Sequence, residues 1–174
     1  MRTIKFLAII LVAVLVLDSC RKIEKLPNIP YIEFTSFAVF DTLDILGNIN
    51  KAGRLKFYFE DGDGDVGLKQ PSDIQPDTTN MFLELYRKTD GNMVLSTNEA
   101  DPLLPSSSYR IPYMERLGQN KILKGTISVI LPYLDYSPTD TVRYDFIIKD
   151  RALNKSNVAS TSEIVISANN IYTK

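Results

Sequence analysis

Short runs of alternating apolar and polar residues cover most of the chain. In the run 54–60, Leu55, Phe57 and Phe59 fall on one face of an extended strand, because side chains alternate between the two faces. The run 141–149 alternates in the same way. No stretch shows the sustained 3.6-residue apolar repeat of an amphipathic helix. The pattern therefore predicts an all-β protein.

The runs and the turns between them predict about seven strands. The Asp90-Gly91 pair supplies the residues of a tight turn and predicts a hairpin between the third and fourth strands. Short strands at irregular spacing predict an immunoglobulin-like antiparallel β-sandwich, and a closed lipocalin-like barrel is the alternative. The expected strands are 31–40, 54–60, 81–88, 93–96, 124–131, 141–149 and 160–166.

The N-terminus has the pattern of an export signal. Arg2 and Lys5 precede an apolar run, 6–17, that is shorter than the roughly twenty residues of a membrane-spanning helix. The run ends in Leu-Asp-Ser-Cys at residues 17–20, which resembles the lipobox of bacterial lipoproteins. This resemblance implies that Cys20 is lipidated, whereas the alternative is a short anchor helix with an incidental cysteine.

The expected organisation follows from that signal. Residues 1–19 form a signal peptide, 20–30 a lipidated tether with two prolines, and 31–174 one β-sandwich domain. We expect the protein in the cell envelope, held by its lipid on the periplasmic face of the outer membrane. Cys20 is the only cysteine, so the domain contains no disulfide.

Charge argues against one class of partner. The first nineteen residues contain Arg2, Lys5 and Asp18, so the remaining chain keeps 18 of the 20 basic and 20 of the 21 acidic residues. A nearly balanced chain has no basic surface for phosphates, and we expect no nucleic-acid partner.

Two segments carry a family resemblance. Residues 59–68 (FEDGDGDVGL), together with 140–143 (DTVR) and 148–157 (IKDRALNKSN), resemble small lipoproteins of Bacteroidota-type bacteria. The last segment is also similar to the Asp-x-Ala-Gly-Asn-x-Ser ending of bacterial immunoglobulin-like modules, with Leu153 in the place of the glycine. The resemblance implies a surface or periplasmic sandwich and no enzymatic activity.

The same two segments predict a calcium site. Carboxylates that alternate with glycines can converge on one hard cation, although the spacing is not that of an EF-hand. In an immunoglobulin-like sandwich the two loops lie at the same end, so their oxygens can complete one site. Neutralisation by Arg151, or a solvated acidic turn, is the alternative. The expected ligands are Asp61, Asp63, Asp65, Asp150, Asn154 and Asn157.

Signals for catalysis are weak. The chain has no histidine and no nucleotide-binding or nucleophile motif, which excludes the Ser-His-Asp triad. Glu84, Glu99, Asp101 and Glu115 are interpreted as surface charges. A non-catalytic binding or structural module is therefore the favoured function, and a small calcium-dependent glycan-active enzyme is the alternative.

Tyrosines near proline- and serine-containing loops are the candidate ligand contacts. A tyrosine ring can stack on a glycan or anchor a protein partner, or it can close the open end of a sandwich. The candidates are Tyr109, Tyr113, Tyr133 and Tyr136.

Overall fold

A computed structural model describes residues 25–70, 78–97, 101–115, 121–133 and 135–174. The expected signal peptide, Cys20 and Glu99 lie outside this range. Every regular element in the described residues is a β-strand. None of these residues forms a helix long and apolar enough to cross a membrane.

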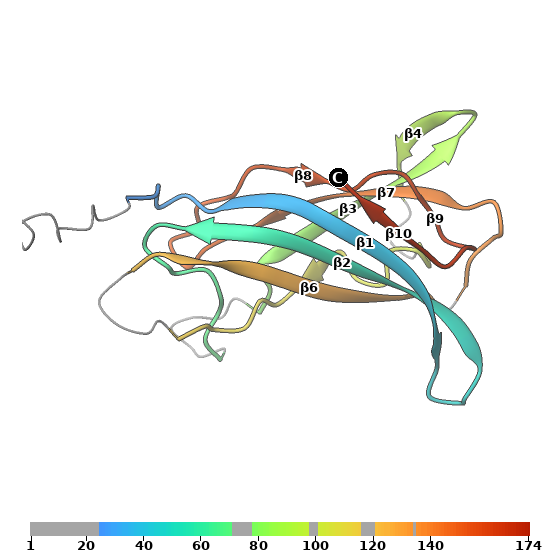
Figure 1. The fold of residues 1–174 in the computed structure, drawn as a ribbon, viewed down its shortest axis with the longest axis horizontal. Helices are drawn as coiled ribbons and strands as arrows, with labels where there is room; N and C mark the ends of the chain where they lie inside the picture. The colour runs from blue at the N-terminus through green and yellow to red at the C-terminus, as the bar shows by residue number, and fades with distance from the viewer. Residues whose placement is uncertain (1–24, 71–77, 98–100, 116–120, 134) are drawn as a thin grey trace, which may run out of the picture.

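In the described residues, ten strands form two antiparallel sheets. Figure 1 shows how the sheets are arranged. The first sheet has the order β10-β1-β2-β6, and the second has the order β4-β3-β7-β8, with β5 paired to β3 and β9 paired to β7. The strands are β1 (Tyr31–Leu43), β2 (Ile49–Asp61), β3 (Met81–Thr89), β4 (Asn92–Leu95), β5 (Ser108–Tyr109), β6 (Leu123–Tyr133), β7 (Thr141–Ile148), β8 (Ala159–Ser160), β9 (Ile164–Val165) and β10 (Asn170–Thr173).

This order corresponds to the immunoglobulin arrangement. Strands β1, β2 and β6 take the places of A, B and E in one sheet, and β3, β7 and β8 those of C, F and G in the other. The predicted sandwich is confirmed, and its two separate sheets are not the alternative closed barrel. The predicted hairpin at Asp90-Gly91 is also confirmed, because β3 and β4 pair antiparallel across it.

The strand count differs from the prediction. Strands β5 and β10 were missed because both are short and carry little apolar alternation. The predicted strand 160–166 is divided into β8 and β9, which pair with different parts of β7. Strands β1 and β2 run several residues beyond their predicted limits into a long hairpin.

The core lies between the inner faces of the two sheets. Phe37 stacks on Tyr144 with ring centroids 5.7 Å apart, and Phe57 packs on Phe146 at 5.1 Å. Gly53 makes room for the first pair, since a Cβ there would lie 2.2 Å from Cζ of Phe37. These contacts join β1 and β2 to β7.

Parts of two long connections complete this core. Val66 and Leu68 follow β2, while Leu103 and Ile111 lie between β4 and β6, and all four side chains are buried. An isolated bridge between Leu68 and Pro112 holds the two loops together. The described parts of both connections are therefore packed into the domain.

Candidate metal centre

Two loops that are distant in sequence meet at one end of the sandwich. Asp61 is the last residue of β2, and Asp150 follows β7 by two residues. Val66 forms an isolated antiparallel bridge with Asp150, and the Arg151 amide donates to the Asp65 carbonyl at 3.4 Å. The prediction that the two acidic segments lie side by side is confirmed.

Three carboxylates converge where these loops meet. Asp61, Asp65 and Asp150 each offer an oxygen, and these oxygens all lie within 4.8 Å of one another. Asp61 and Asp150 are fully buried, and Asp65 is half-buried. We call these three residues the acidic triad.

Asp61 shapes its own loop with one carboxylate oxygen. Its Oδ2 accepts hydrogen bonds from the amides of Asp65 at 2.7 Å and Val66 at 3.1 Å. Its Oδ1 is buried and has no hydrogen-bond partner among the described residues. Burial, followed by repulsion from Asp63 and Asp65, raises the pKa of Asp61 to about 6. The second oxygen is therefore available to a ligand.

Asp65 and Asp150 complete the triad from two different loops. Burial, and then the charges of Asp150 and Asp63, raise the pKa of Asp65. The Asp65 Oδ1 is also buried without a hydrogen-bond partner in the described residues. Asp150 closes its turn by accepting from the Asn154 amide and side chain, each at 2.7 Å. An ordered loop thus presents each acid.

Arg151 does not neutralise the triad by direct contact. Its guanidinium Nη1 donates to the Gly67 carbonyl at 2.8 Å and its Cζ lies 5.3 Å from the Tyr113 ring centroid. Across the part of the chain that is described, no ion pair joins Arg151 to the triad. The arginine charge lowers the pKa of Asp65 only through space.

The structure gives the other three predicted ligands different surroundings. Asp63 is outside the group whose oxygens converge, and its charge acts on Asp61 and Asp65. Asn154 supports Asp150 with its amide nitrogen. Asn157 points elsewhere: its Oδ1 accepts from the Ile32 amide and its Nδ2 donates to the Ile32 carbonyl, both at 2.9 Å. Asn157 therefore fastens its loop to β1.

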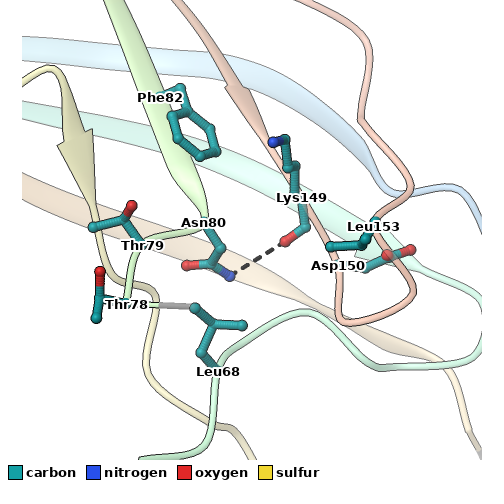
Figure 2. A pocket seen from close by; sticks show the side chains of 8 residues that line it. All are labelled: Leu68, Thr78, Thr79, Asn80, Phe82, Lys149, Asp150 and Leu153. Atoms are coloured by element: carbon teal, nitrogen blue, oxygen red, sulfur yellow. Dashed lines mark hydrogen bonds between the residues drawn. The ribbon is translucent and has the colours of Figure 1, made fainter. Parts of the chain in front are cut away.

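A small cavity of about 230 Å³ opens beside Asp150, and Figure 2 shows the side chains that line it. Buried Asn80 forms its wall, where Nδ2 donates to the Lys149 carbonyl at 3.2 Å and Oδ1 accepts from the Ile111 amide at 2.7 Å. Asn80 thereby holds β3, β7 and the loop before β6 together. Sequence reasoning missed this residue, because its partners are distant in sequence.

The structure distributes the candidate tyrosines between core and surface. Tyr133 is fully buried and pairs its hydroxyl with that of Tyr144 at 2.9 Å, so its ring cannot reach a partner in this fold. Tyr109 and Tyr136 are half-buried against the core. Tyr113 is 41% exposed. Two cationic side chains lie near its ring: the Lys69 Nζ and the Arg151 Cζ are each 5.3 Å from the ring centroid.

Among the candidate catalytic carboxylates that the structure describes, Asp101 is not the surface charge that the sequence predicted. Asp101 is buried and accepts hydrogen bonds from Arg87 at 2.6 and 2.7 Å and from Ser96 at 2.7 Å. Glu84 and Glu115 are exposed, on β3 and in the loop before β6. Asp101 thus serves an ion-pair network that links its loop to β3.

The β1–β2 turn exposes an apolar surface at the opposite end of these strands from Asp61 (Figure 1). Neighbouring strands pair only as far as Val39 and Lys51, so the turn projects beyond them. We call residues 43–49 the hairpin tip. Its four aliphatic side chains are at least 66% exposed: Leu43, Ile45, Leu46 and Ile49.

Hydrogen bonds order the hairpin tip. The Asp44 carboxylate accepts from the amides of Leu46 at 2.8 Å and Asn48 at 2.9 Å. It also accepts from the side chains of Asn48 and Asn50. Gly47, with φ +85°, completes the turn. The apolar side chains are therefore presented on an ordered loop.

Comparison with protein-family models, with curated proteins and with solved structures gives no match for this chain.

Proposed function

We propose that this chain is a non-catalytic binding module of the bacterial cell envelope. A lipid on Cys20 holds it on the periplasmic face of the outer membrane. Structural calcium stabilises the end of the domain near the tether, and the hairpin tip at the other end contacts a protein partner. The single observation that carries the binding role is the exposed apolar tip.

An ordered apolar surface of this kind supports a docking role. Soluble proteins rarely expose large aliphatic side chains in one continuous group, because each exposed group loses the free energy gained on burial. Ile45 and Leu46 lie next to each other at the most projecting part of the hairpin tip, and both are more than 80% exposed. A partner that offers a hydrophobic pocket would bury them without reordering the turn.

The chemistry of the acidic triad supports calcium. The chain has no histidine and its only cysteine is Cys20, so the domain offers oxygen ligands alone. Calcium accepts six to eight oxygens in flexible geometry, and backbone carbonyls can supply those beyond the carboxylates. The partnerless Oδ1 atoms of Asp61 and Asp65 are the atoms that such an ion would satisfy.

The same site is connected to the tether. The Gly62 amide, next to Asp61, donates to the Pro27 carbonyl at 2.9 Å. A Cβ on Gly62 would lie 2.2 Å from the Leu26 carbonyl oxygen, so the chain passes close by. Calcium that orders the loop after β2 would therefore also order the last residues of the tether.

Calcium binding is tested by isothermal titration of the full-length chain in non-ionic detergent. We expect one site per chain with a dissociation constant on the order of 0.1–1 mM, as in extracellular calcium modules. Asp65→Asn should abolish the binding heat. Asp90→Asn is the matched control: it makes the same change in the exposed β3–β4 turn, where asparagine tolerates the φ of 50°. This variant should leave the binding heat unchanged. Equal binding by all three proteins would contradict the site.

Partner binding is tested by affinity capture of the lipidated chain from its own membranes, followed by mass spectrometry. We expect one stoichiometric protein that is lost in the double variant Ile45→Ser and Leu46→Ser. Val158→Ser is a control at another exposed aliphatic residue. A partner retained by the double variant would place binding elsewhere on the domain.

A further inference from the structure

One sheet edge differs from all the others. Strand β6 has 11 residues and, among the described residues, pairs on one side only, with β2. The other outer strands are shorter: β4 and β10 have 4 residues each, and β5, β8 and β9 have 2 each. Short edge strands resist further pairing, whereas a long one presents a row of backbone donors and acceptors.

The inner face along β6 is incompletely covered. Leu123, Ile127 and Val129 point toward the core but remain half-buried. Their neighbours on β2, such as Leu55 and Phe57, are fully buried. An added strand beside β6 would cover these three aliphatic side chains and continue the first sheet.

The sequence of this edge favours pairing with another strand. Residues 125–133 contain no charged side chain and are rich in β-branched residues. Natural edges are usually protected by inward-pointing charges. Pro132 protects only one end of β6, because it has no amide hydrogen to donate.

We propose that β6 pairs antiparallel with β6 of a second copy of this chain. A two-fold axis perpendicular to the sheet keeps both inner faces on the same side, so the two four-stranded sheets become one. The pairing satisfies backbone groups of 125–131 and buries Ile127 and Val129 of each copy.

The charges at the ends of the strand favour a second copy as the occupant. Lys124 lies just before the uncharged stretch and exposed Asp135 just after it. With the axis near Val129, antiparallel strands place the Lys124 end of each copy beside the Asp135 end of the other. A single paired edge gives a weak dimer, which concentration on a membrane surface would favour. This inference depends on neither calcium nor the hairpin tip.

The alignment is tested with single cysteines in the full-length chain in isolated membranes. Thr126→Cys, Ser128→Cys and Ile130→Cys each replace an exposed residue on the outer face of β6. Lys56→Cys is the matched control, since Lys56 is exposed on β2 and directly opposite Ser128. The chain with Cys20 alone gives the background, and a short bis-maleimide is the cross-linker.

An antiparallel dimer predicts a steep dependence on position. The distance along the strand between a residue and the same residue of the other copy grows with each step away from the two-fold axis. It grows by about 6.6 Å per residue, which is twice the strand rise. Dimer yield should be high for Ser128→Cys or Ile130→Cys, and at background for Thr126→Cys and Lys56→Cys. Equal yields at the three β6 positions, or no yield above Lys56→Cys, would overturn the proposal.

Charge reversal tests the same alignment without touching the core. In the Ser128→Cys chain, Asp135→Lys should lower the yield by roughly threefold to tenfold, because it makes both strand ends basic. Adding Lys124→Glu should restore the yield. If Asp135→Lys leaves the yield unchanged, the antiparallel alignment is wrong.

Discussion

Substituting two buried tyrosines, one at a time, by phenylalanine should destabilise the domain by different amounts. The Tyr144 hydroxyl donates to the Leu103 carbonyl at 2.5 Å and contacts the Tyr133 hydroxyl at 2.9 Å. Tyr144→Phe removes both hydrogen bonds and leaves the Leu103 carbonyl and the Tyr133 hydroxyl in the core. Tyr133→Phe removes one bond and leaves Tyr144 still bound to Leu103. The first variant should therefore be the less stable.

The size of the difference follows from what remains buried. A buried polar group without a partner costs about 1–3 kcal/mol, so Tyr144→Phe, which leaves two such groups, should cost about 2–6 kcal/mol. Tyr133→Phe loses one hydrogen bond and should cost about 0.5–1.5 kcal/mol. In a domain of this size the thermal midpoint shifts by about 2–4 °C per kcal/mol.

Circular dichroism during urea unfolding measures both changes, because the chain has no tryptophan for fluorescence. Burial raises the pKa of Tyr144 well above 10, so the difference should not vary between pH 6 and pH 9. Equal losses in the two variants, or a larger loss in Tyr133→Phe, would show that the Leu103 carbonyl is not held as described.

Three further predictions address the anchor, a strained turn and a buried acid. Cys20→Ala should leave the fold intact but release the chain from membranes, and retention after carbonate washing would contradict this. Leu153 has φ 69°, so Leu153→Gly should stabilise the domain by up to about 1 kcal/mol in thermal melts, and a lower midpoint would contradict it. Burial tends to raise the pKa of Asp101, but hydrogen bonds from Arg87 and Ser96 bring it below its usual value. Ionised Asp101 thus stabilises the fold at pH values above its pKa in the unfolded chain, and this stabilisation is lost as the pH falls through its lower pKa in the folded protein. In Asp101→Ala, the free energy of unfolding should therefore fall less steeply with decreasing pH than in wild type.

Local patterns predicted the sheets well. The alternation of apolar and polar residues predicted which faces of β2 and β7 point into the core, and the Asp90-Gly91 turn predicted the β3–β4 hairpin. The two-residue strand β5 carried no such signal, since its pairing with β3 depends on a contact across the fold. Pro132 interrupted the pattern of β6, which hid the fact that Tyr133 continues the strand into the core.

The candidate site was predictable where the chemistry was local. Alternating glycines marked Asp61 and Asp65, and the immunoglobulin topology placed Asp150 beside them. Asn157 shared the sequence signal but binds the backbone of Ile32, a contact that no local pattern indicates. The hairpin tip was missed for a related reason: apolar residues predict burial, and only the limits of the neighbouring strands show that these remain exposed.

The proposed binding of calcium to the acidic triad is tested most directly by thermal melting of two proteins. The full-length chain and Asp61→Asn are melted in chelator and in calcium at about ten times the dissociation constant, where binding contributes about 1.4 kcal/mol. Wild type should gain about 3–6 °C. Asp61→Asn should not respond to calcium, and should melt no lower than wild type in chelator, because it removes one of three crowded charges. A wild-type midpoint unmoved by calcium, or an equal gain in Asp61→Asn, would contradict the account.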